Sequence, residues 1–168
     1  KLNIKSRNSI KNIIYKTLEK FSKIDILINN AGINQRCDFY EITDSDWDKM
    51  LDVNLRGAFI FTQECLKVMK KNSRIINISS VAGTKGISFI SAYAAAKSAL
   101  INFSKSCAIE AAPNVRVNCV IPGAIETPSF SAAMMTDEML ESTKNTIPLK
   151  RVGKPIEVAN AVMFLLSD

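Results

Sequence analysis

Short runs of apolar residues alternate along this chain with longer stretches whose apolar residues recur at helical spacing, and this alternation limits the folds open to it. We predict strands at residues 24–28, 74–78 and 115–121, the first too apolar to be half exposed. Helices are expected near residues 10–21, 46–69, 91–110, 136–143 and 155–166. Buried strands that alternate with helices indicate one α/β domain, residues 1–168, in which helices cover a parallel sheet.

The residue types present exclude several kinds of site. The chain contains no histidine, which excludes Ser-His-Asp and Cys-His triads and metal sites that need imidazole. The four cysteines never form a C-x-x-C pair, so we expect no zinc or redox motif and no metal site. The longest apolar run, residues 161–166, is too short to span a membrane, and no apolar signal core follows the basic N-terminus. We expect a cytoplasmic protein with reduced cysteines.

The formal net charge of +6 comes from the first 23 residues, which hold seven basic residues and one glutamate. The rest of the chain has fifteen basic and fifteen acidic residues. A Lys-rich helix face in water explains this charge better than an anionic partner, because no arginine cluster or aromatic stripe accompanies it. We therefore expect neither nucleic acid nor a membrane as a partner.

Small or polar residues follow each predicted strand, at residues 29–32 (N-N-A-G), 79–80 (S-S) and 122–123 (P-G). Ligands of open parallel sheets bind beyond the carboxyl ends of the strands, and small residues let the backbone approach a ligand closely. Each segment alone is typical of an ordinary turn. Three such segments at one edge of a sheet predict a binding site.

Tyr93 and Lys97 lie four residues apart in a predicted helix, so their side chains share one face. A nearby ammonium lowers the pKa of a phenol from about 10 because it favours the phenolate. The pair is therefore a candidate acid–base, although a single pair at this spacing also arises by chance. Ser80 is expected to hydrogen-bond the oxygen that receives the proton, or else to cap a turn.

Asn54 is an amide within an otherwise apolar helical stretch, L-D-V-N-L. A buried amide must find hydrogen-bond partners. Asn54 either marks a distortion at a functional site or is a core amide bonded to neighbouring backbone, and the sequence leaves both interpretations open.

Five segments together resemble the short-chain dehydrogenase/reductase family: N-N-A-G, V-N-L-R-G, I-N-I-S-S, Y-A-A-A-K and R-V-N-C-V-I-P-G-A-I-E-T, in this order. The resemblance runs from about residue 2 to residue 168. It implies a Rossmann-like, doubly wound parallel sheet and an NAD(P)-dependent oxidoreductase that interconverts a ketone and a secondary alcohol. The chain most resembles the 3-oxoacyl-[acyl-carrier-protein] reductases. Sugar-acid or polyol dehydrogenases of the same family are the alternative. The segments at residues 33–48 and 122–128 resemble these enzymes slightly more than they resemble the reductases.

The resemblance also implies roles for individual residues. Tyr93 would donate or accept the proton, and Lys97 would lower its pKa and hold the nicotinamide ribose. Ser80 would orient the carbonyl group, and Asn54 would hold a water in a proton relay. The resemblance also implies two groups of coenzyme-binding residues. Those beside the adenosine are Asn29, Asn30, Ala31 and Gly32. Those beside the nicotinamide are Pro122, Gly123, Ile125 and Thr127.

The chain departs from the family pattern in one respect. No G-x-G-x-x-G loop for the phosphates is present, and Asn3 stands where the family often has an aspartate beside the adenine. We therefore expect the chain to lack the first strand-turn-helix unit and the last strand of the fold, to be part of a longer protein, and not to bind coenzyme tightly alone. The choice between NADP and NAD is not readable, and the resemblance slightly favours NADP.

Substrate choice is expected to depend on residues 34–38, 83–89 and 129–139.

Two other function classes compete with the dehydrogenase. A non-catalytic ligand-binding remnant is disfavoured by the intact Ser80, Tyr93 and Lys97, and a tyrosine-dependent epimerase or dehydratase normally needs a larger substrate domain.

We also expect a homodimer or homotetramer through the helices near residues 46–69 and 91–110, because their apolar residues exceed what one sheet face can cover. Those apolar residues are Phe59, Ile60, Phe61, Leu66, Met69, Ala99, Phe103, Ala108 and Ile109.

Overall fold

The computed structural model describes residues 2–128, 130 and 136–167. Three parallel strands, β1 (Ile26–Asn29), β2 (Ser73–Ile78) and β3 (Val115–Val120), lie side by side in that order. The register pairs Asn29 with Asn77, and Asn77 with Cys119. The three predicted strands and their parallel arrangement are confirmed, with ends displaced by at most two residues.

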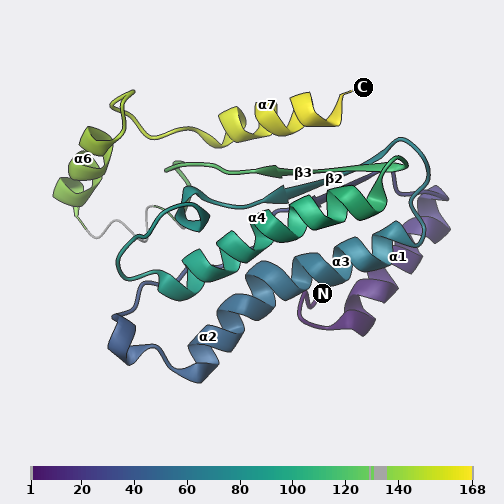
Figure 1. Cartoon of the computed structure of the whole chain (residues 1–168), viewed down its shortest axis with the longest axis horizontal. Helices are drawn as coiled ribbons and strands as arrows, with labels where there is room; N and C mark the ends of the chain where they lie inside the picture. Colours follow the sequence, from purple (N-terminus) through teal and green to yellow (C-terminus); the bar gives the residue numbers. More distant parts are fainter. Residues whose placement is uncertain (1, 129, 131–135, 168) are drawn as a thin grey trace.

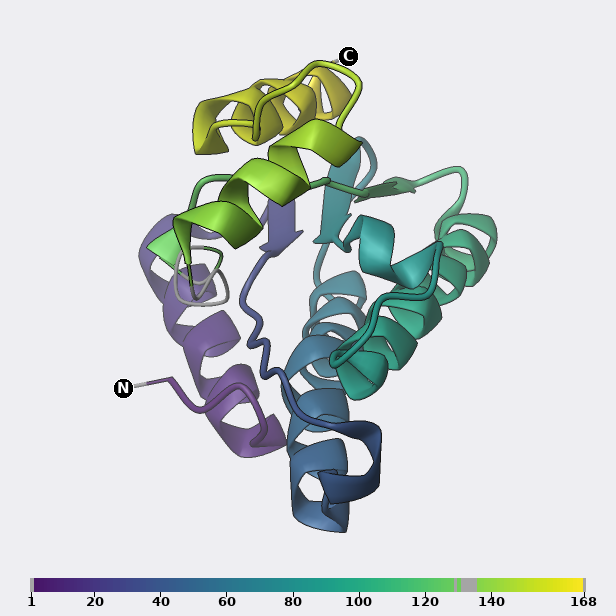
Figure 2. The ribbon, with the colours of Figure 1, turned by 90° about the vertical axis from the view of Figure 1, so that its left-hand side faces the viewer.

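Helices cover both faces of this sheet (Figure 1). They are α1 (Arg7–Phe21), α2 (Asp44–Leu51), α3 (Gly57–Leu66), α4 (Ser91–Ala111), α6 (Asp137–Thr146) and α7 (Pro155–Leu166). Helices α3 and α4 pack on one face, and α7 packs on β2 and β3 from the other. Figure 2 shows these layers from the carboxyl ends of the strands. The predicted doubly wound α/β architecture is confirmed.

Strand β1 is less buried than its composition predicts. Ile26 and Ile28 are each 45% exposed, whereas Leu27, on the other face, packs into the core under α1 and α3. Helix α7 lies over β2 and β3, so within the described residues it leaves the Ile26 face of β1 largely open. An apolar run shows that a strand prefers burial, but it does not show how far the covering helix reaches.

Helix α1 begins directly after Ser6, which caps it. The Ser6 side chain accepts a hydrogen bond from the Ser9 N–H, which satisfies one of the unpaired donors at the start of the helix. The buried face of α1 presents Ile10 and Ile14 to Ile60 and Cys65. This apolar contact holds α1 beside α3.

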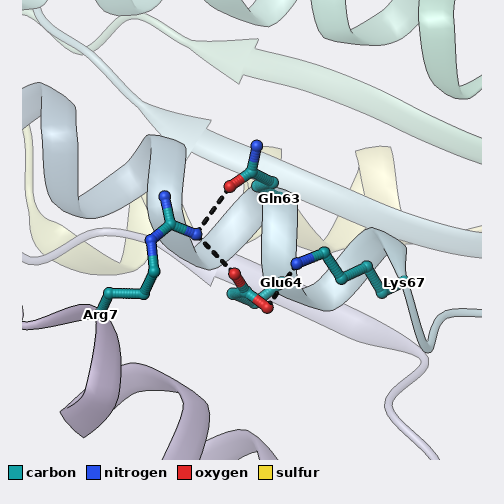
Figure 3. A network of polar contacts seen from close by, with 4 residues as sticks. All are labelled: Arg7, Gln63, Glu64 and Lys67. Carbon is teal, nitrogen blue, oxygen red and sulfur yellow. Dashed lines mark hydrogen bonds and ion pairs between the residues drawn. The ribbon is translucent and has the colours of Figure 1, made fainter.

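A charged cluster at the start of α1 reinforces this contact (Figure 3). Arg7 Nη1 donates to Gln63 Oε1 at 2.7 Å and also to the carboxylate of Glu64, and Lys67 Nζ lies 2.8 Å from Glu64 Oε2. The hydrogen bond from Lys67 is the main cause that lowers the pKa of the Glu64 carboxyl. The cluster therefore joins α1 to α3 through a carboxylate that stays ionised at neutral pH.

The single helix predicted over residues 46–69 is wrong in one respect, because the structure divides it. A π-helical turn, η2 (Asp52–Arg56), separates α2 from α3. Asn54 lies in this turn and is only 2% exposed. The amphipathic pattern did not show the turn, but the buried amide marks it, as one of the two interpretations of Asn54 expected.

Most of the apolar side chains expected as surplus on this helix are packed inside the molecule. Ile60 is buried, Phe61 and Met69 pack against the core beside α1, and Leu66 packs beneath β2 and β3. Phe59 stays partly exposed on this helix and meets Phe103 of α4 edge-on at 6.3 Å between ring centroids. On α4, Ile109 is 80% exposed. None of the described helices combines the length and the apolar character needed to cross a membrane.

Candidate active site

The strands end at one edge of the sheet, and backbone hydrogen bonds join the segments that follow them. The Ser79 N–H donates to Val120 O at 2.8 Å, and the Val81 N–H donates to Pro122 O at 2.9 Å. Seen from this edge, the segment after β1 runs between α1 on one side and the start of α4 on the other (Figure 2). The structure thus brings the three predicted segments to the same edge, which we call the rim.

Ser80, Tyr93 and Lys97 meet at the rim. Tyr93 and Lys97 lie in the first two turns of α4, and Ser80 caps the short 3-10 turn η3 (Val81–Gly83) by accepting a hydrogen bond from the Ala82 N–H at 3.1 Å. The Ser80 side chain also hydrogen-bonds the Tyr93 side chain. Lys97 Nζ lies 5.7 Å from the centroid of the Tyr93 ring. Ser80 therefore caps the turn, which was the alternative expected for it, and also lies beside the phenol. That it orients the carbonyl oxygen stays a prediction.

The surroundings of Tyr93 raise the pKa of its phenol, and Lys97 is not among the causes of this shift. That Lys97 lowers this pKa stays a prediction. Burial is the main cause, because it disfavours the charged phenolate, and the hydrogen bond with Ser80 opposes it to a smaller extent. The Lys97 ammonium donates instead to Ile78 O at 2.8 Å. In this structure Tyr93 is therefore protonated at neutral pH and set to donate a proton.

Lys97 is buried, with 5% of its surface exposed. Burial lowers the pKa of its ammonium to about 8, and the Cys119 thiol nearby acts in the opposite direction. An ammonium has three donors. Among the described residues Ile78 O is the one acceptor that Lys97 contacts, so its other donors are available to a ligand at the rim.

We expect Lys97 to make the stability of the coenzyme-free protein depend on pH. Its folded pKa of about 8 lies below the usual 10.5, so over this interval the unfolded chain binds a proton that the folded chain has released. The free energy of unfolding should therefore rise with pH across the interval, by up to about 3 kcal/mol. Lys97→Met removes the titrating group, and denaturant unfolding of both proteins measures the difference. A difference that stays constant from about pH 8 to 10.5 would contradict the burial of the ammonium.

Asn54 bonds both ends of its amide to the segment after β1. Its Oδ1 accepts from the Ile33 N–H at 3.1 Å, and its Nδ2 donates to Ile33 O at 2.9 Å and to Met50 O at 3.0 Å. A Cβ on Gly32 would lie 2.7 Å from Asn54 Oδ1, which is too close for any side chain. Asn54 is thus a core amide bonded to backbone, and it fixes the position of the rim segment. That it also holds a water stays a prediction.

The side chain of Asn29 faces the interior of the fold. Its Nδ2 donates to Asn77 Oδ1 at 2.8 Å and to Thr62 Oγ1 at 3.2 Å, and Asn77 Nδ2 donates to Ser104 Oγ at 2.8 Å. These bonds connect β1 and β2 to α3 and α4 just below the rim. Asn77, Thr62 and Ser104 were not predicted from the sequence, although a lone amide in the apolar strand R-I-I-N-I signals a buried partner.

The next three residues, Asn30, Ala31 and Gly32, are exposed at the rim. Gly32 lies beside the catalytic candidates, since a Cβ built on it would be 3.5 Å from Lys97 Nζ. Their exposure leaves the backbone of this segment open to a ligand, as the predicted coenzyme contact requires.

The segment after β3 carries the residues expected beside the nicotinamide. Pro122 follows β3, and Gly123 has open space where a side chain would stand. Ile125 forms a short parallel bridge with Gly153, and Thr127 lies just beyond it, partly buried. The bridge fixes this segment against the chain that leads into α7.

Turn η3 packs directly on the backbone of α4. The Ser79 hydroxyl donates to Lys97 O at 2.8 Å. A Cβ on Gly83 would lie 2.8 Å from both Lys97 C and Ser98 N. Gly83 was predicted only as the start of a substrate loop, and its contact with α4 could not be seen in the sequence. This contact sets the distance between Ser80 and α4.

Two of the three segments expected to choose the substrate, residues 34–38 and 83–89, meet near the rim, where the Cys37 N–H donates to Phe89 O at 2.9 Å. Within the third segment, residues 129 and 131–135 lie outside the described part of the chain.

Comparison with known proteins agrees with this geometry. A family model described as Enoyl-(Acyl carrier protein) reductase matches residues 1–168. The chain is 41% identical over 174 residues to a 3-oxoacyl-[acyl-carrier-protein] reductase of Thermotoga maritima and 44% identical over 170 residues to that of Aquifex aeolicus. Each alignment covers 99% of this chain and 68% of the relative. The fold also matches aldohexose dehydrogenase of Thermoplasma acidophilum, with a TM-score of 0.94, 31% identity, and coverage of 98% of this chain and 69% of that one. The chain thus spans about two thirds of the length of these proteins.

Proposed function

The chain belongs to the short-chain dehydrogenase/reductase family, and we propose that it carries the proton-transfer site of an NAD(P)-dependent enzyme that interconverts a ketone and a secondary alcohol. The relatives confirm the expected family, its oxidoreductase class and the likeness to 3-oxoacyl-[acyl-carrier-protein] reductases. The observation that carries the proposal is the contact between Ser80 and Tyr93 beside the buried Lys97, at the carboxyl ends of the strands.

Tyr93 is the residue that we assign to proton transfer. Its raised pKa keeps the phenol protonated at neutral pH, so in the reduction direction it donates a proton to the carbonyl oxygen. Ser80 hydrogen-bonds Tyr93, so its hydroxyl is placed to donate to the same oxygen and orient it. Asn54 holds the segment that borders this site.

The rim fits a nicotinamide coenzyme. The unused donors of the Lys97 ammonium suit ribose hydroxyls. Gly32 and Gly123 are exposed, so the backbone is accessible to the coenzyme in the segments after β1 and after β3. When bound, the coenzyme supplies or accepts the hydride. The sequence contains no glycine turn of the kind that binds a pyrophosphate, so we assign to this chain the adenosine contacts of residues 29–32 and the ribose and nicotinamide contacts. Resemblance to the 3-oxoacyl reductases is our reason for favouring NADP over NAD.

We propose a 3-oxoacyl thioester as the substrate, because identity to reductases of that class extends over 99% of the chain. A sugar acid or polyol is the second candidate, supported by the fold likeness to an aldohexose dehydrogenase. The third possibility, a non-catalytic remnant, is disfavoured by the assembled Ser80 and Tyr93.

The test is a screen of the purified full-length protein with NADPH and NADH against acetoacetyl thioesters and keto sugar acids. Oxidation of the coenzyme is followed by its absorbance. We expect turnover with one of these substrate classes. Absence of turnover with every combination, in protein shown to bind coenzyme, would contradict the proposal and favour the remnant.

We further propose that the protein is a cytoplasmic homodimer or homotetramer assembled through α3 and α4. The exposed Phe59 and Ile109 and the edge-on pair of Phe59 with Phe103 supply apolar surface on these helices. All four cysteines are free, which suits a reducing compartment. We expect light scattering at micromolar concentration to give a multiple of the chain mass, and a monomer mass under those conditions would contradict the assembly.

A further inference from the structure

Two rim segments meet at Arg36 and Phe89. The Cys37 N–H donates to Phe89 O at 2.9 Å, and the guanidinium carbon of Arg36 lies 5.3 Å from the centroid of the Phe89 ring. Arg36 follows β1, and Phe89 stands two residues before α4 begins. A cation therefore stacks on an aromatic ring beside the entrance to the catalytic helix.

Phe89 adopts a backbone conformation that a large residue rarely occupies. Its φ of 69° lies in the left-handed region, which glycine adopts without strain. Its ring is nevertheless 50% exposed, so burial of the ring does not explain why phenylalanine is there. Phe89 precedes Tyr93 by four residues, a span of at most about 14 Å. Strain at a position this close to the reacting phenol points to a function for the ring.

Arg36 differs from the other arginines of the chain in its contacts. The other five each donate a hydrogen bond to a carboxylate, an amide or a backbone carbonyl oxygen: Arg7, Arg56, Arg74, Arg116 and Arg151. Within the described residues, the guanidinium of Arg36 contacts the Phe89 ring and donates to no oxygen.

Three carboxylates lie near Cys37, those of Glu41, Asp46 and Asp38. Asp38 accepts a hydrogen bond from the Tyr40 N–H, and Asp46 accepts from Thr43 and Gln35. Within the described part of the chain, none of the three carboxylates forms an ion pair with Arg36, whose guanidinium contacts the Phe89 ring. The donors of Arg36 are thus available to an anion that comes from outside the protein.

We propose that Arg36, backed by Phe89, binds an oxyanion of the substrate at a distance from its reacting carbonyl. The inference rests on the proposed reductase function, and it names the part of the substrate, an oxyanion, that this site recognises. The planar fork of a guanidinium matches a carboxylate or a phosphate with two parallel hydrogen bonds, and the ring of Phe89 sets the plane of the fork. The oxyanion is either the carboxylate of a sugar acid or a phosphate of a carrier-linked thioester.

The test compares steady-state kinetics of the wild type and Arg36→Ala on three ketones: a keto sugar acid, acetoacetyl-coenzyme A, and the uncharged thioester acetoacetyl-N-acetylcysteamine. We expect Arg36→Ala to lower kcat/KM about 10- to 100-fold, chiefly through KM, for an anionic substrate, because charged hydrogen bonds are lost. Turnover of the uncharged thioester should stay within about twofold of the wild type. A loss confined to the sugar acid identifies a carboxylate, and a loss confined to the coenzyme A thioester identifies a phosphate.

Two further variants control the experiment. Arg116→Ala removes the same side chain from the opposite end of the sheet, where Arg116 donates to Ser167 O, and should leave all three substrates unaffected. Phe89→Gly keeps the left-handed backbone without strain and removes only the ring. It should reproduce part of the Arg36→Ala loss, and the double variant should lose less than the two single losses combined.

The outcomes separate the inference from the function on which it rests. If Arg36→Ala lowers kcat/KM equally for charged and uncharged substrates, or for none, the oxyanion site is wrong and the reductase function stands. If the wild type reduces none of the three ketones, the proposed function fails and the inference fails with it.

Discussion

Tyr93→Phe is expected to lower turnover about 10²-fold or more, the usual cost of losing a general acid, with the fold and coenzyme affinity preserved. The substitution removes the hydroxyl that Ser80 contacts and keeps the ring that packs beside Lys97. The kcat from coenzyme absorbance and the Kd of the coenzyme from fluorescence titration measure the two effects separately.

Tyr40→Phe is the matched control, because it removes the same hydroxyl from a side chain that is 94% exposed. It should leave both kcat and Kd unchanged. If Tyr93→Phe turns over at nearly the wild-type rate, the proton comes from another group and the proposed site is wrong.

Gly83→Ala is expected to reduce both stability and turnover. The added Cβ would stand 2.8 Å from backbone atoms of Lys97 and Ser98, so turn η3 must move away from α4. Overpacking of this kind costs about 1–3 kcal/mol of unfolding free energy. Displacing Ser80 from Tyr93 by about 1 Å should cost about 10²-fold in turnover as well. Denaturant unfolding and the ketone assay measure the two losses.

Gly86→Ala tests the specificity of that effect. Gly86 belongs to the same loop, has no atom within 4 Å of its added Cβ, and has no positive φ. Its replacement should change the free energy of unfolding by no more than about 0.5 kcal/mol. Equal stability and activity in the two variants would show that η3 does not set the Ser80 position.

The sequence was sufficient for the layers of the fold because apolar runs and helical periodicity report burial directly. It was insufficient where burial depends on a neighbour. Ile26 and Ile28 look like core residues, yet the helix that covers the sheet lies over β2 and β3. The helical periodicity also did not show the π-helical turn around Asn54, because one extra residue changes no composition and only shifts the phase of the pattern. The isolated amide was the one sign of a distortion there.

For the site, spacing alone placed Tyr93 beside Lys97, and the order of strand and turn placed Ser80 near both. The predicted lowering of the pKa of the phenol by Lys97 does not appear, because burial raises that pKa and Lys97 is not among the groups that shift it. A charge at a given spacing acts through its position and burial, and here the ammonium bonds a backbone carbonyl while burial dominates. The contact of Arg36 with Phe89 joins two loops, which no local pattern can reveal.

The π-helical turn at residues 52–56 determines which elements the two halves of the long connection between β1 and β2 contact. Helix α2 contacts α4, whereas α3 contacts α1 and β1. Each residue of a regular helix advances the side chains by about 100°, so the extra residue turns the second half relative to the first by about that angle. Removing one residue from this turn would therefore act as a rotation of one half-helix, and the faces that now meet α4 and α1 would no longer both point inward.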